Sequence, residues 1–183
     1  YTGHCWYHSV SAAQTTELRN IAEQHRLPIY SYCGGFGRAD DSGGPQDVRQ
    51  NWERTCQTAR RLGAGWLSGG YGVPENRPLV RELSRKYEIA FAFENHPNEK
   101  SADDILRRIE GFEDVMGVAF DTGWAGTCGF NAPETIRKLS HRLKEVHLKD
   151  VRAAGRHDTC ALGVGVGELL DLDFNIRAAV RTR

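Results

Sequence analysis

Three residues that can bind a metal ion or move protons, Glu94, Asp121 and His147, lie near the carboxyl ends of three short segments. In each segment, bulky apolar residues alternate with small or polar ones, which is the two-residue period of a β-strand with two different faces. All three residues fall on the less bulky face. The segments are residues 89–94, 117–121 and 145–150.

Two carboxylates and one imidazole suit a divalent cation such as Mn²⁺, Mg²⁺, Co²⁺ or Zn²⁺. Three protein ligands leave coordination positions for water and substrate. Such a cation can hold a sugar's carbonyl and neighbouring hydroxyl, and stabilise the enediolate formed when a proton leaves the carbon between them. Glu94 is the candidate acid or base for that proton. The alternative is that Glu94, Asp121 and His147 only cap strand ends and bond loop backbone, but their shared phase favours the metal site.

Two further groups of polar residues have open interpretations. Lys149 shares the interior face of His147, where its ammonium can hold a developing oxyanion or a phosphate, or form an ion pair with an interior carboxylate. His4 and His8 lie in the aromatic segment 1–11, which has no clear periodicity and is predicted to be a loop. Either histidine can face a ligand.

The segments that must position these residues alternate between strand and helix. Apolar residues at helical spacing predict the helices, and proline or capping residues mark their ends. The caps are Ser101 with Asp104 and Asn131 with Glu134. Predicted strands are 29–33, 66–68, 89–94, 117–121 and 145–150; predicted helices are 14–25, 45–62, 74–87, two that follow Ser101 and Asn131, and 169–180.

This alternation is typical of a parallel sheet, either an open doubly wound sheet or a closed (β/α)8 barrel. Functional side chains at the carboxyl ends of several strands, small interior faces and apolar helix stripes favour the barrel. The early Gly-x-Gly-x-x-Gly turn of a dinucleotide-binding sheet is missing. The glycines at 34, 35 and 37 can contact a phosphate or simply allow a turn.

The 183 residues are fewer than the roughly 250 of a complete barrel. The expected fold is therefore α/β, a partial (β/α)8 TIM barrel with roughly five to six of the eight βα units. We expect residues 1–183 to form a single incomplete domain that lacks the N-terminal strand or strands and the last strand. Because an open barrel edge exposes unpaired strand backbone, a homo-oligomer is a possible outcome.

Composition excludes several classes of function. Lys and Arg balance Asp and Glu at 24 each, so no overall charge favours nucleic acid or a membrane surface. No apolar run approaches the roughly 20 residues that span a bilayer. The five cysteines are widely spread and form no Cys-x-x-Cys pair, so a reducing, cytoplasmic setting is expected. The predicted partner is a small molecule. The cysteines are Cys5, Cys33, Cys56, Cys128 and Cys160.

Together these motifs resemble the sugar phosphate isomerase/epimerase superfamily, the xylose-isomerase-like TIM barrels of the AP endonuclease family 2 type. The resemblance runs from about Leu18 to Asp171 and depends on the combination of motifs, since each alone is weak. The motifs are residues 93–97 (FENHP), 120–123 (FDTG), 133–139 leading into 146–151 (VHLKDV), and 162–165 (LGVG).

The resemblance implies a sugar or polyol isomerase or epimerase that works through a divalent metal and an enediolate. The implied alternatives are a dehydratase of the inosose type, an endonuclease-IV-like phosphodiesterase, and a truncated remnant without activity. The implied site residues are Glu94, Asp121 and His147 for the metal, Glu94 and Lys149 for catalysis, and Asn95, His96 and Trp124, together with His4, for the substrate.

Three departures from the family's pattern affect these expectations. Trp124 stands where many members have His or Asn, which removes a possible second metal ligand and disfavours the nuclease. Val164 occupies a position that is often acidic. The family takes a fourth metal ligand, a Glu, from the last strand, and this ligand is expected to be missing here.

Overall fold

The computed structural model of the protein describes residues 10–34, 48–70 and 76–167. Several predictions fall on other residues and so lie outside the described part: His4, His8 and Cys5, the glycine loop beyond Gly34, the starts of two helices, and the helix 169–180. All predicted strands lie within the described part. Its residues divide into two units.

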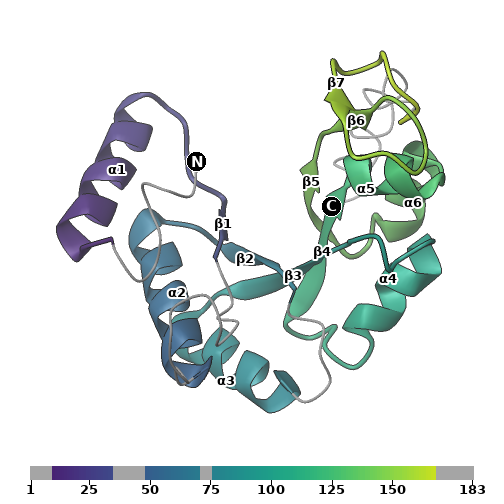
Figure 1. Cartoon of the computed structure of the whole chain (residues 1–183). Coiled ribbons are helices and arrows are strands. Elements are labelled where there is room, and N and C mark those ends of the chain that lie inside the picture. The colour runs from purple at the N-terminus through teal and green to yellow at the C-terminus, as the bar shows by residue number, and fades with distance from the viewer. Residues whose placement is uncertain (1–9, 35–47, 71–75, 168–183) are drawn as a thin grey trace. The chain divides into compact units, whose positions relative to one another are not determined.

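The strands and helices alternate along the chain as predicted (Figure 1). Their order is α1 Ala12–Gln24, β1 Ser31–Cys33, α2 Val48–Leu62, β2 Trp66–Gly69, α3 Arg77–Tyr87, β3 Ala90–Glu94, α4 Ala102–Ile109, β4 Met116–Asp121, α5 Thr122–Cys128, α6 Ala132–Leu139, β5 Leu143–His147, β6 Asp150–Val151 and β7 Thr159–Cys160.

The five longer strands follow one another in the sheet in the order β1-β2-β3-β4-β5. The pairs β1–β2 and β4–β5 are parallel. Consecutive order is the arrangement of a βα-barrel, whereas a doubly wound sheet reverses its strand order at a switch point. The fold is therefore α/β with the strand order of a partial (β/α)8 barrel, as predicted. The short strands β6 and β7 form a separate antiparallel pair.

The first unit consists of the described residues among 1–92 and 114–116. Its core includes Trp52 and Cys56 of α2, Leu67 of β2 and Leu83 of α3, all buried. Helix α1 forms where the spacing of apolar residues predicted a helix. Ser11 and Gln14 close a capping box at its start, and Ile21 is 45% exposed.

The second unit consists of the described residues among 93–113 and 117–183. Phe93, Ile105, Phe120 and Leu139 are buried in its core. Both predicted helix caps are present: the Ser101 side chain accepts a hydrogen bond from the backbone N–H of Asp104, and the Asn131 side chain accepts one from Glu134. These caps fix where α4 and α6 begin.

Two elements of the second unit differ from prediction. Helix α5 was not predicted, because its sequence Thr-Gly-Trp-Ala-Gly-Thr-Cys contains two glycines and no apolar stripe. Strand β5 begins earlier than predicted and ends at His147, whereas the prediction ran to Asp150. Asp150 instead starts β6. Among the described helices, none is long and apolar enough to cross a membrane.

Candidate functional site

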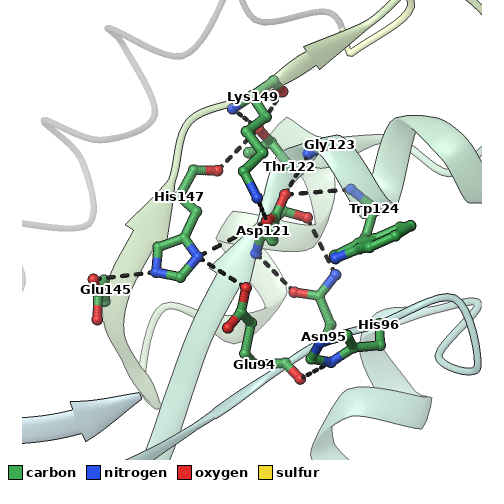
Figure 2. Close-up of polar contacts among 10 residues, drawn as sticks. All are labelled: Glu94, Asn95, His96, Asp121, Thr122, Gly123, Trp124, Glu145, His147 and Lys149. Carbon is green, nitrogen blue, oxygen red and sulfur yellow. Dashed lines mark hydrogen bonds and ion pairs between the residues drawn. The ribbon is translucent and has the colours of Figure 1, made fainter. Parts of the chain in front are cut away.

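The three predicted metal ligands lie at the carboxyl ends of neighbouring strands of the second unit. Glu94 ends β3, Asp121 ends β4 and His147 ends β5. In the parallel register of β4 and β5, Asp121 lies opposite His147. The register shifts once, between Val118 and Ala119, and after that shift the Ala119–Asp121 and Glu145–His147 positions match. Figure 2 shows the three side chains converging.

The three side chains bring one nitrogen and two carboxylate oxygens close together. The Nδ1 atom of His147 lies 3.0 Å from Oε1 of Glu94 and 3.8 Å from Oδ2 of Asp121. One ligand atom from each residue lies within 4.8 Å of the other two. Because a bound cation sits about 2.0–2.2 Å from such ligands, small side-chain movements allow one cation to contact all three. The residues thus fit a divalent metal.

The two oxygens of Asp121 have different partners. Oδ1 accepts hydrogen bonds from the backbone N–H groups of Gly123, at 2.8 Å, and Trp124, at 3.3 Å, and so caps the start of α5. Oδ2 lies 2.5 Å from Nζ of Lys149 and faces His147. Oδ1 of Asp121 thus acts as a helix cap, and Oδ2 is the candidate metal ligand.

The site is strongly polarised. Burial raises the pKa of Asp121, but contacts with His147 and Lys149 lower it, and the net pKa is below the usual value. Contacts with Asp121, Glu145 and Glu94 raise the pKa of His147 to about 12, although burial opposes this. The imidazole therefore carries a proton at neutral pH in this arrangement. A metal bound through this ring must displace that proton, so binding releases it.

Lys149 forms the ion pair with an interior carboxylate that was one of its two predicted interpretations. Its side chain is 46% exposed, and its partner Asp121 is fully buried. Thr122, at the start of α5, fixes the Lys149 backbone: its hydroxyl accepts from the Lys149 N–H at 2.9 Å and donates to the Lys149 carbonyl at 2.6 Å. Thr122 of α5 thus holds the Lys149 backbone, and Asp121 of β4 holds its ammonium at the edge of the site.

The three predicted substrate contacts that are described surround this cluster. Asn95 is fully buried, and its side-chain amide bonds both backbone groups of Asp121. His96 is exposed, and its Nδ1 lies 2.9 Å from the carbonyl oxygen of Glu94. The ring of Trp124 lies 6.1 Å from that of His96. His96 and Trp124 thus lie beside the cluster as neighbouring rings, while Asn95 lies beneath Asp121.

Two neighbouring side chains had no role assigned from the sequence. Glu145 Oε1 lies 3.1 Å from Nε2 of His147, and the ring of His157 packs edge-on against Trp124 at 4.6 Å between ring centres. Glu145 had a signal, because it lies two positions before His147 on the same strand face. His157 lies in a loop without periodicity, so no sequence pattern indicated it.

A second carboxylate of the unit, that of Asp150, organises the glycine-rich loop. Its side chain accepts four backbone hydrogen bonds at 2.9–3.0 Å. Burial raises the pKa of Asp150, but these bonds outweigh it and lower the pKa below its usual value. The donors are Val151, Gly163, Gly165 and Gly167. The alternating glycines in this loop thus surround a carboxylate of the chain itself.

The fold and the site together define a βα-barrel type of protein with two carboxylates and a histidine at its strand ends. The chain belongs to the xylose isomerase-like TIM barrel family, whose family model matches residues 3–179. This confirms the resemblance predicted from the sequence. A search of curated proteins found no match.

Solved structures with the same fold are distant in sequence. A xylose isomerase domain protein from Planctomyces limnophilus is 17% identical, with a TM-score of 0.73 over 94% of this chain and 73% of that one. The probable 3-DHS dehydratase AsbF of Bacillus anthracis is 14% identical, with a TM-score of 0.72 over 91% and 72%. The 3-keto-D-glucoside 4-epimerase YcjR of E. coli is 14% identical, with a TM-score of 0.67 over 92% and 74%.

Proposed function

We propose that this protein is a divalent-metal-dependent isomerase or epimerase of a sugar, sugar phosphate or related polyol. The convergence of Glu94, Asp121 and His147 at three strand ends supports this most directly. Membership of the xylose isomerase-like family also supports it. Among the matching structures, one protein from Mycobacterium smegmatis was solved with magnesium, and the IOLI protein was solved with zinc.

In the proposed reaction, a proton leaves the carbon beside a carbonyl and returns to the same or the neighbouring carbon through an enediolate. The bound metal supplies the Lewis acidity that polarises the carbonyl. Glu94 is the proposed proton acceptor, because its carboxylate lies in the cluster of candidate ligands. Its side chain is 14% exposed, so a substrate can reach it.

The other residues hold the substrate and its developing charge. The ammonium of Lys149 lies at the edge of the cluster, where it can stabilise negative charge on the substrate oxygen as the proton leaves. His96 and Trp124 present neighbouring rings beside the cluster, and we propose that they contact the body of the sugar. Asn95 acts through Asp121, because its amide bonds the Asp121 backbone.

The metal site is tested by titrating purified protein with Mn²⁺ and with Zn²⁺ in a calorimeter. We compare the wild type with Glu94→Gln and His147→Ala. Each substitution removes one of three ligands, so we expect affinity to fall at least about tenfold. Glu134→Gln is the matched control, since Glu134 pairs only with Lys138 on an exposed face of α6 in the described contacts.

The reaction is tested by incubating the metal-loaded protein with ketoses, aldoses and their phosphates in deuterated water. Isomerisation or epimerisation through an enediolate incorporates deuterium at the exchanged carbon, whereas a dehydratase releases a product that has lost water. Unchanged metal affinity in both Glu94→Gln and His147→Ala would remove the site on which the proposal depends.

A further inference from the structure

The two ring nitrogens of His147 have different partners. Nδ1 faces the candidate ligands, 3.0 Å from Oε1 of Glu94 and 3.8 Å from Oδ2 of Asp121. Nε2 points the other way, to Oε1 of Glu145 at 3.1 Å (Figure 2). A neutral imidazole has one N–H donor and one lone pair. Carboxylates only accept, and they face both nitrogens, so without a metal each nitrogen can carry a proton. When a metal takes the Nδ1 lone pair beside Glu94 and Asp121, the remaining N–H is on Nε2 and faces Glu145.

The position of Glu145 makes this bond a fixed feature of the strand. Glu145 and His147 are two residues apart in β5, so their side chains leave the same face. Glu145 lies opposite Ala119 in the register of β4 and β5, and Ala119 contributes only a methyl group. The side chains of Glu145 and His147 are 20% and 22% exposed, so water competes only partly for their bond.

We propose that Glu145 is a positioning residue for His147 as a metal ligand. By accepting the Nε2–H bond, it selects the tautomer and the ring orientation that direct the Nδ1 lone pair to the metal. This inference builds on the proposed metal site and adds a residue to it. Carboxylates that bond the far nitrogen of a ligand histidine raise its basicity and fix its orientation, and removing one typically lowers metal affinity 10–100-fold.

The charges around the site are consistent with this role. Glu94, Asp121 and Glu145 are the carboxylates in contact with the imidazole, and Lys149 is paired with Asp121. With His147 neutral, a divalent cation and the Lys149 ammonium together balance the three carboxylates. Glu145 lies on the far side of the ring and can accept from Nε2–H while Nδ1 faces a metal.

The test compares zinc affinities of the wild type, Glu145→Gln, Glu145→Ala and the surface control Glu134→Gln, by competition with a chromophoric chelator. We expect Glu145→Ala to bind zinc 10–100-fold more weakly. Glu145→Gln should retain most of the affinity, because its amide oxygen can accept the same N–H. Glu134→Gln should match the wild type.

A second readout reports the hydrogen bond itself. In zinc-loaded protein with ¹⁵N-labelled histidine, the Nε2–H resonance of His147 should be protected from exchange in the wild type and in Glu145→Gln, and lost in Glu145→Ala. Unfolding of the metal-free variants shows whether each is folded; if Glu145→Ala is not, the Glu145→Gln resonance decides the question.

The role of Glu145 would be overturned if folded Glu145→Ala bound zinc as tightly as the wild type, or if the Nε2–H of Glu145→Gln exchanged freely. Either result would leave the metal site in place. Wild-type protein that binds no zinc, or binds it equally well after His147→Ala, would instead overturn the proposed function.

Discussion

The side-chain amide of Asn95 bonds both backbone groups of Asp121. Its Oδ1 accepts from the Asp121 N–H at 2.7 Å, and its Nδ2 donates to the Asp121 carbonyl at 3.1 Å. These bonds join the segment after β3 to the end of β4, directly beneath a candidate metal ligand. Because Asn95 is fully buried, water cannot easily replace them.

Replacing Asn95 by Ala should therefore destabilise the protein and weaken metal binding together. Leaving buried backbone groups of Asp121 unpaired costs about 1–3 kcal/mol, and a displaced Asp121 is a poorer ligand. Chemical unfolding and zinc titration measure the two effects. Asn131→Ala is the control, since losing the α6 cap costs about 1 kcal/mol but should leave zinc affinity unchanged. Equal zinc affinity in both variants would contradict the coupling.

Replacing Lys149 by Met should lower stability and raise metal affinity. The buried carboxylate of Asp121 loses its cationic partner, which costs about 1–3 kcal/mol given that Lys149 is half exposed. The same change removes a positive charge beside the metal ligands, so a divalent cation is bound more tightly. Thermal unfolding with and without zinc measures both, and zinc should raise the melting temperature more in Lys149→Met than in the wild type.

Lys138→Met is the control for this prediction, because Lys138 forms an exposed pair with Glu134 on α6. Exposed pairs contribute about 0–1 kcal/mol. Weaker zinc binding by Lys149→Met would contradict this prediction. It would mean that Lys149 is needed to hold Asp121 in place as a ligand, and that this effect exceeds the repulsion between its ammonium and the metal.

The Asp150 carboxylate should make stability depend on pH in the acid range. Its pKa is lowered in the folded protein, so its contribution is present above the unfolded value of about 3.9 and is lost as the pH falls through the folded pKa. Asp150→Asn should cost about 1.5–3 kcal/mol near neutral pH. The difference in the free energy of unfolding between Asp150→Asn and the wild type should narrow below about pH 4. Urea unfolding from pH 3 to 7 measures this difference. Asp103→Asn, at an exposed position of α4, should show no comparable gap.

Replacing Gly165 by Ala should detach the glycine-rich loop from Asp150. A Cβ there would lie 2.1 Å from the Val151 carbonyl oxygen and 2.5 Å from Oδ1 of Asp150. The first contact is with backbone, so the loop itself must shift, at a cost of about 1–3 kcal/mol. Proteolysis of the loop and unfolding measure this. Gly70→Ala, whose Cβ would meet nothing within 4 Å, should be tolerated; equal effects of the two substitutions would contradict the steric explanation.

Much of the fold follows from local patterns in the sequence. The caps at Ser101 and Asn131 and the apolar stripes of α2, α4 and α6 predicted helices close to those observed. Helix α5 was missed because it has no apolar stripe, and because its start depends on the Asp121 side chain, whose capping role helical spacing does not reveal. The spacing of Leu18, Ile21 and Ala22 predicted helix α1, but it does not specify burial, because burial depends on what packs against a helix.

Strand alternation by itself determined that Glu94, Asp121, Glu145 and His147 lie on interior faces, because side chains in a strand alternate with a fixed period of two. Only the tertiary structure decided which of them meet. The register shift between Val118 and Ala119 sets Asp121 opposite His147, and register depends on pairing between distant segments. The same pairing brings Lys149 to Asp121, a contact that no spacing within one strand specifies. The two-residue spacing puts Glu145 and His147 on one face of β5, and the structure shows that they bond there through the far nitrogen of the ring.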